Sequence, residues 1–97
     1  MDKIFEVLDK TGRKIYLPNR TWSHITRKHP YIANYIEETK ETIQKPDRIT
    51  KWSVDKDVRY YYRYYKNKVP PKYLLVIVKY LNGTGFIISA YFTSYIK

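Results

Sequence analysis

Two short runs at the start of the chain, over residues 4–8 and 13–17, contain mostly apolar and aromatic side chains and are typical of extended segments. The segment between the runs, 9–12, is polar and ends in glycine, as tight turns often do. The pattern therefore predicts a β-hairpin at the start of the chain.

A helical period follows in the next part of the sequence. Over residues 20–29, apolar and aromatic side chains recur on one helical face, and Pro30 ends the segment. Over residues 32–44, apolar or small side chains recur at alternating spacings of four and three, before Lys45-Pro46 stops the helix. The sequence therefore predicts two consecutive helices.

Four extended segments complete the chain, over residues 48–53, 58–66, 73–80 and 86–92. The third is apolar at both parities, which is typical of a central strand buried on two sides. The resulting order, ββααββββ, predicts an α+β fold. We expect the N-terminal hairpin and the two helices to pack on one face of an antiparallel sheet, leaving the other face open to a ligand.

Ninety-seven residues are enough for one domain, so we expect residues 1–97 to form a single unit. The absence of cysteine excludes disulfides, thiolate nucleophiles and zinc ribbons. The acidic residues lie on one predicted helix or in turns, so neither a metal nor another cofactor is expected. Without a long apolar run or a signal peptide, a cytoplasmic protein with no membrane contact is the expectation.

Charge is the strongest functional signal in the sequence. The chain carries 19 Lys and Arg against 9 Asp and Glu, a net charge of +10, and it also holds 12 tyrosines. A strongly basic surface indicates a polyanionic partner, and tyrosines interleaved with arginines suit stacking on unpaired bases. RNA is the partner we expect, with DNA and an acidic protein as alternatives.

Strand parity selects the candidate RNA contacts, because successive residues of a strand point to opposite faces. With simple antiparallel pairing, the arginines of segment 58–66 and the polar residues of segment 86–92 and its end are expected to share the open face. That shared set is Arg59, Arg63, Ser89, Tyr91 and Thr93. The candidate nucleic-acid contacts are Arg59, Tyr61, Arg63, Lys28 and Thr93.

Metal-free cleavage of RNA requires a base for the 2′-hydroxyl, an acid for the 5′-oxygen and positive charge on the phosphorane. Histidine is the side-chain type best suited to moving protons near neutral pH, and both histidines fall on the first predicted helix. The candidate catalytic set is His24, His29, Arg63, Ser89 and Tyr91. Which histidine is acid and which is base stays open.

Several motifs together resemble a known superfamily across roughly residues 14–95. The matching segments are Trp22-Ser23-His24-Ile25, Arg27-Lys28-His29-Pro30, Lys45-Pro46-Asp47, the strand around Arg63, 74–78 and Ile87-Ile88-Ser89-Ala90-Tyr91. They resemble the phage and toxin members of the barnase, EndoU, colicin and RelE-like (BECR) nucleases, and also the BrnT-type toxins with a RelE fold. Tyr31 departs from this pattern, because the position after His-Pro is usually acidic in the superfamily.

The resemblance implies a RelE/barnase-like fold and a small, metal-independent endoribonuclease. It implies a toxin of a toxin-antitoxin pair or a phage-like effector, with an acidic antitoxin protein as partner. By position, His24 and His29 match the helix histidines, Arg63 the strand arginine and Ser89 the late-strand hydroxyl. Two other functions stay open: a nucleic-acid-binding domain without catalysis, and a basic interaction protein or inhibitor that binds an acidic partner.

Overall fold

The computed structural model describes residues 3–67 and 72–96 of the chain. Its elements follow the predicted order ββααββββ, with one short 3₁₀ helix, η1, between the two α-helices. The elements are β1 (Lys3–Leu8), β2 (Lys14–Pro18), α1 (Asn19–Lys28), η1 (Pro30–Asn34), α2 (Ile36–Gln44), β3 (Arg48–Lys51), β4 (Val58–Tyr65), β5 (Lys72–Leu81) and β6 (Thr84–Thr93).

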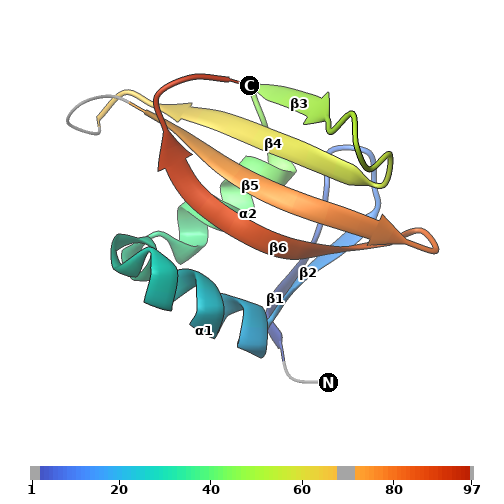
Figure 1. Cartoon of the computed structure of the whole chain (residues 1–97), viewed down its shortest axis with the longest axis horizontal. Coiled ribbons are helices and arrows are strands. Elements are labelled where there is room, and N and C mark those ends of the chain that lie inside the picture. The colour runs from blue at the N-terminus through green and yellow to red at the C-terminus, as the bar shows by residue number, and fades with distance from the viewer. Residues whose placement is uncertain (1–2, 68–71, 97) are drawn as a thin grey trace.

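The strands form one six-stranded sheet in the order β1-β2-β6-β5-β4-β3 (Figure 1). Strands β3 to β6 run as a meander, and four of the five neighbouring pairs are antiparallel. The fifth pair, β2 with β6, is parallel and is short, joining Ile15 to Gly85 and Tyr16 to Phe86. The expectation of a wholly antiparallel sheet is wrong at this junction, because the meander returns β6 in the direction of β2.

Both α-helices cover the same face of the sheet, as the sequence predicts (Figure 1). Helix α1 packs against β6 and β2, and α2 packs against β5, β1 and β4. The buried core lies between these helices and the sheet. It consists of Phe5, Ile15, Leu17, Ile25, Ile32, Ile43, Tyr61, Leu74, Val76, Val78, Tyr80, Ile87 and Ala90. We call this side of the sheet the helix face and the other side the open face.

The second predicted helix, 32–44, is divided in the structure. Its first residues belong to η1, where the Tyr35 N–H donates to the Ile32 carbonyl at 2.8 Å. Tyr35 has a non-helical backbone, with φ −123° and ψ 34°, and α2 starts after it. The buried positions Ile32, Thr39 and Ile43 still lie against the core, so the predicted apolar stripe is present although the helix is interrupted.

Strand β6 contains a bulge that changes which of its residues face the helices. Val78 pairs with Ile87, but the preceding Ile77 pairs with Ser89, so Ile88 is an extra residue. One extra residue moves every later side chain to the opposite face. Ile87 therefore points to the helix face, whereas Ser89, Tyr91 and Thr93, the polar set of β6, point to the open face.

The arginines of β4 lie on the other side of the sheet from that polar set. Arg59 pairs with Val78 and Arg63 with Leu74, and both partners are buried under the helices. Paired residues of neighbouring strands point to the same face. The expected shared surface of β4 arginines and β6 hydroxyl residues is therefore wrong, and the bulge at Ile88 is the physical reason.

A buried carboxylate ties the first hairpin to the centre of the sheet. Asp9 is 6% exposed, and its Oδ1 accepts the N–H of Thr11 at 2.9 Å and that of Arg13 at 2.8 Å. Its Oδ2 accepts the hydroxyls of Tyr61 at 2.7 Å and Tyr80 at 2.8 Å. Burial raises the pKa of Asp9, but these hydrogen bonds outweigh it and lower the pKa to about 2.

Within the residues that the structure describes, no helix has the length and apolar character needed to cross a membrane.

Candidate nucleic-acid interface

Helix α1 presents a basic stripe on the side away from the core. Ile25 is fully buried and Trp22 is half-buried against the core, so the opposite face of α1 is exposed. The exposed charged or titratable residues on that face recur at spacings of three and four, which places them within about 100° of one another. We define them as the α1 stripe: Arg20, His24, Arg27 and Lys28.

The surroundings of the α1 stripe contain very little negative charge. No Asp or Glu occurs from residue 10 to residue 36, nor from residue 58 to the end of the chain. The first stretch includes β2, α1 and η1, and the second includes β4, β5 and β6. Because α1 packs against β6, the fold brings the two acid-free stretches together. The positive charge of the stripe is therefore not neutralised locally.

Three aromatic rings adjoin the end of the α1 stripe. The ring of His29, directly after α1, stacks on Tyr91 of β6 with 5.2 Å between centroids and an interplanar angle of 25°. Tyr31 contacts His29 edge-on at 5.9 Å and is 43% exposed. We call His29, Tyr31 and Tyr91 the aromatic edge. Exposed rings beside a row of cations are the arrangement that binds unpaired nucleotides.

The aromatic edge lies beside the later part of β6, which does not pair with β2. Strand β2 pairs with β6 only at Gly85 and Phe86, so among the described residues the later part of β6 has no strand on that side. Helix α1 and η1 lie beside this part of β6 instead (Figure 1). The Phe92 N–H donates to the hydroxyl of Tyr31 at 3.3 Å. The helix end and the strand are thereby held together.

Arg63 is committed to contacts within the protein, on the helix face. Its Nη1 donates to the carbonyl oxygen of Lys45 at 2.6 Å, and its Nε lies 3.3 Å from Oε1 of Glu41. The Tyr65 hydroxyl donates to the same Glu41 oxygen at 2.6 Å, which, with the nearby Arg63 charge, lowers the pKa of Glu41. These contacts fasten β4 to the end of α2 and leave Arg63 away from both histidines.

Tyr61 and Arg59, two other predicted RNA contacts, also lie on the helix face and bond within the protein. Tyr61 is 1% exposed and bonds to Asp9, so a nucleic acid cannot reach it, and its prediction as an RNA contact is wrong. Arg59 is half-buried, and its Nη1 donates to the carbonyl oxygens of Lys56 and Val58. It therefore stabilises the turn before β4.

The remaining predicted residues divide into two groups. His24 and Lys28 are exposed on the α1 stripe. Ser89 and Thr93 lie half-buried on the open face, on either side of Tyr91, and the Thr93 hydroxyl donates to the carbonyl of Tyr95 at 3.4 Å. The structure thus brings His29 and Tyr91 together and places Lys28 and Ser89 nearby in the chain, but it does not bring Arg63 to them.

The sequence prediction missed three residues of this surface. Arg20 and Arg27 complete the α1 stripe, and their spacing from His24 together with the acid-free stretch around them is a signal that could have identified them. In the sequence, Tyr31 stands out only as a departure from the superfamily pattern. Its role in the aromatic edge depends on the contact between η1 and β6, which no local pattern encodes.

No group of three or more His, Asp or Glu side chains within residues 3–67 and 72–96 is arranged to hold a metal ion. Comparison of the chain with protein-family models, curated proteins and solved structures finds no match.

Proposed function

We propose that this protein binds RNA through the α1 stripe and the adjoining aromatic edge. The observation that supports this most is the row of exposed Arg20, Arg27 and Lys28 in an acid-free part of the surface, next to the exposed ring of Tyr31. Cations without local acidic partners attract the phosphate backbone, and aromatic rings beside them bind bases that are not paired.

The test replaces the three cations of the stripe together, as Arg20→Gln, Arg27→Gln and Lys28→Gln. Each lost phosphate contact lowers the salt dependence of binding to single-stranded RNA by about 0.7 in the logarithmic slope. We therefore expect the slope to fall by about 2 and the affinity at low salt to fall with it. Fluorescence anisotropy with labelled RNA at several salt concentrations measures both quantities.

The matched control carries the same change in net charge at exposed lysines elsewhere, as Lys10→Gln, Lys51→Gln and Lys56→Gln. This control should bind RNA nearly as well as the wild-type protein, with a similar slope. Equal losses in the two triple variants would mean that net charge alone attracts RNA, and would contradict a defined interface on α1.

A second candidate function is the metal-independent endoribonuclease implied by the BECR resemblance, with its RelE/barnase-like fold and acidic antitoxin. The stacking of His29 on Tyr91 next to Lys28 supports it, because it fixes a proton-transfer group beside a cation on the proposed RNA surface. The positions of Arg63 and Tyr61 on the helix face argue that any transition-state charge is stabilised by the α1 stripe instead.

Cleavage is tested by incubating labelled RNA with the protein in EDTA and identifying the 3′ ends. An enzyme of this class leaves 2′,3′-cyclic phosphates, and the His24→Ala/His29→Ala double variant should lose cleavage while it still binds RNA. If the wild-type protein binds total RNA and ribosomes but cleaves neither, the ribonuclease hypothesis is rejected. The RNA-binding function alone then stands.

A further inference from the structure

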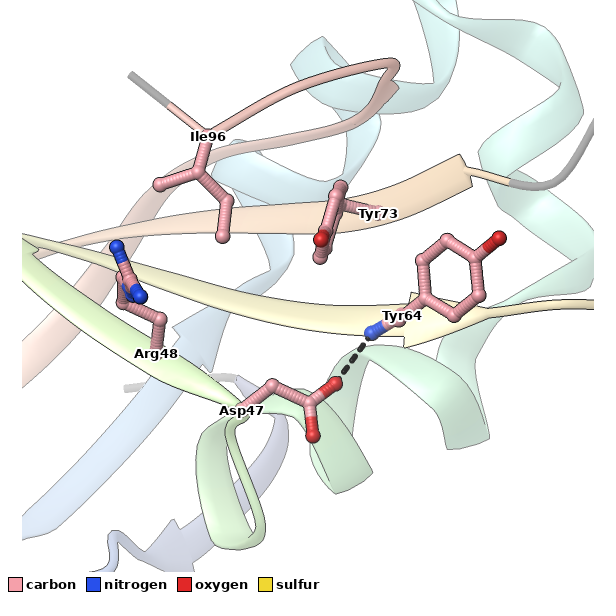
Figure 2. A pocket seen from close by; sticks show the side chains of 5 residues that line it. All are labelled: Asp47, Arg48, Tyr64, Tyr73 and Ile96. Atoms are coloured by element: carbon pink, nitrogen blue, oxygen red, sulfur yellow. Dashed lines mark hydrogen bonds between the residues drawn. The ribbon is translucent and has the colours of Figure 1, made fainter.

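A hollow lies on the open face, away from the α1 stripe. It is a shallow pocket of about 500 Å³ lined by Asp47, Arg48, Tyr64, Tyr73 and Ile96. Figure 2 shows these side chains coming from the start of β3, the ends of β4 and β5 that lie next to each other, and the segment after β6. Its volume falls in the range of sites that hold small ligands.

The chemistry of the lining suits a flat aromatic ligand with negative charge. The rings of Tyr64 and Tyr73 lie 5.1 Å apart at 61° to each other, and Tyr64 is 45% exposed. Arg48 is exposed and, among the described residues, it makes neither an ion pair nor a side-chain hydrogen bond. The pocket therefore offers a stacking surface and an uncommitted guanidinium side by side.

The acidic residue of the lining has a structural task. Oδ2 of Asp47 accepts the N–H of Tyr64 at 2.6 Å (Figure 2), and the Asp47 N–H donates to the carbonyl of Tyr62 at 2.7 Å. These two bonds fix the start of β3 against β4, and so hold Arg48 and Tyr64 in place. Asp47 is a positioning residue here.

The pocket and Tyr91 of the aromatic edge lie on the same face of the sheet. Tyr73 pairs with Thr93, two residues after Tyr91, and with Tyr64 on its other side. Neighbouring strands lie about 4.8 Å apart, so the path from β6 to β4 covers only about 10 Å. Sheets that carry exposed aromatic rings at this spacing bind two or three unpaired bases.

We propose that the pocket of Arg48, Tyr64 and Tyr73 binds an unpaired base of the same RNA, which makes single-stranded RNA the ligand class. This inference rests on the RNA-binding function proposed above. The base stacks on Tyr64 and Tyr73, and Arg48 binds the adjoining phosphate. Duplex RNA cannot use the pocket, because its bases are paired and stacked within the helix.

The test compares a short oligouridine with a blunt RNA duplex of the same length. Tyr64→Ala should weaken binding of the single strand about tenfold, the effect of losing one stacked base, and leave duplex binding unchanged. Tyr64→Phe keeps the ring and should bind as the wild-type protein does. Arg48→Gln should weaken the single strand and lower its salt slope by about 0.7.

Trp52→Ala provides the control, because Trp52 is 43% exposed and lies outside this pocket. Circular dichroism establishes that each variant is folded. Loss of single-strand binding only in Tyr64→Ala and Arg48→Gln supports the pocket. If both of these variants bind single-stranded RNA like the wild-type protein while the α1 triple variant loses that binding, the pocket is not a base-binding site. The RNA-binding function proposed for the α1 stripe then still stands. Absence of RNA binding by the wild-type protein overturns both.

Discussion

Asp9 shows how one side chain can connect distant parts of a small protein that has no cysteine. It lies in the turn between β1 and β2, yet its carboxylate accepts hydrogen bonds from Tyr61 in β4 and Tyr80 in β5. Burial and these hydrogen bonds raise the pKa of Tyr80 to about 12, and they raise the pKa of Tyr61 as well. The cluster therefore holds an ionised carboxylate and two neutral phenols at neutral pH.

The pKa of Asp9 gives a prediction about stability and pH. Its value in the folded protein, about 2, is below the ordinary value of 3.8, so ionised Asp9 stabilises the fold above pH 4. That stabilisation is lost as the pH falls from about 4 towards 2, and it amounts to about 2 kcal/mol. Urea unfolding at pH 7 and pH 2 should show a smaller pH effect in Asp9→Asn than in the wild-type protein.

Glu37→Gln is the control for Asp9→Asn, because it removes one carboxylate that is 75% exposed and pairs with Lys40 at the surface. It should keep the wild-type dependence on pH. An equal response of Asp9→Asn and the wild-type protein to acid would mean that the cluster contributes nothing to acid sensitivity.

At the scale of elements, the junction between β2 and β6 depends on the absence of a side chain at Gly85. A Cβ at this position would lie 2.9 Å from a ring carbon of Tyr80 and 3.0 Å from side-chain carbons of Ile15 and Val78. All three neighbours are buried, so none of them can move into solvent. The short parallel pairing is therefore possible because glycine lets the strands and core side chains approach closely.

Gly85→Ala should lower the free energy of unfolding by about 1–3 kcal/mol, the usual cost of overpacking a core. Chemical denaturation at neutral pH measures the change. The neighbouring Thr84→Ala, at a half-exposed position of the same strand, should cost less than about 1 kcal/mol. Equal stabilities of Gly85→Ala and the wild-type protein would show that the core yields easily at this point.

Elements and their order were predictable because their signals are local. Glycine and proline mark the turns, and the Asn82-Gly83 pair forms a hairpin turn with φ of 56° and 82°, as its sequence predicts. The face of the sheet to which each side chain of β6 points was not predictable in the same way. The bulge at Ile88 depends on how β6 fits against β5, and a one-residue shift reverses every assignment after it.

For the whole molecule, the composition indicates a basic surface rich in tyrosine but does not show which elements carry it. The charge of +10 and the many tyrosines indicated a basic, aromatic interface. Parity placed it on β4, whereas the structure commits Arg63 to Glu41 and Lys45 and buries Tyr61. The row of exposed cations in the acid-free region instead follows α1, and the exposed tyrosine of β4 is Tyr64, from the even set. The helices cover the odd set, but Tyr62 of the even set is also fully buried, so parity alone does not show which tyrosine is accessible.

The hydrogen bond from the Phe92 N–H to the Tyr31 hydroxyl has a consequence for how copies of this protein meet one another. The later half of β6 pairs with β5 but not with β2, so one side of it carries unpaired backbone groups. Such unpaired strand edges can pair with a strand of another molecule, which leads to aggregation. The Tyr31 hydroxyl accepts one of the unpaired N–H groups on this side of β6, and α1 lies alongside it. Both contacts oppose the pairing of a foreign strand at this place. The side of β6 that β2 leaves unpaired is therefore guarded against pairing with a strand of another molecule.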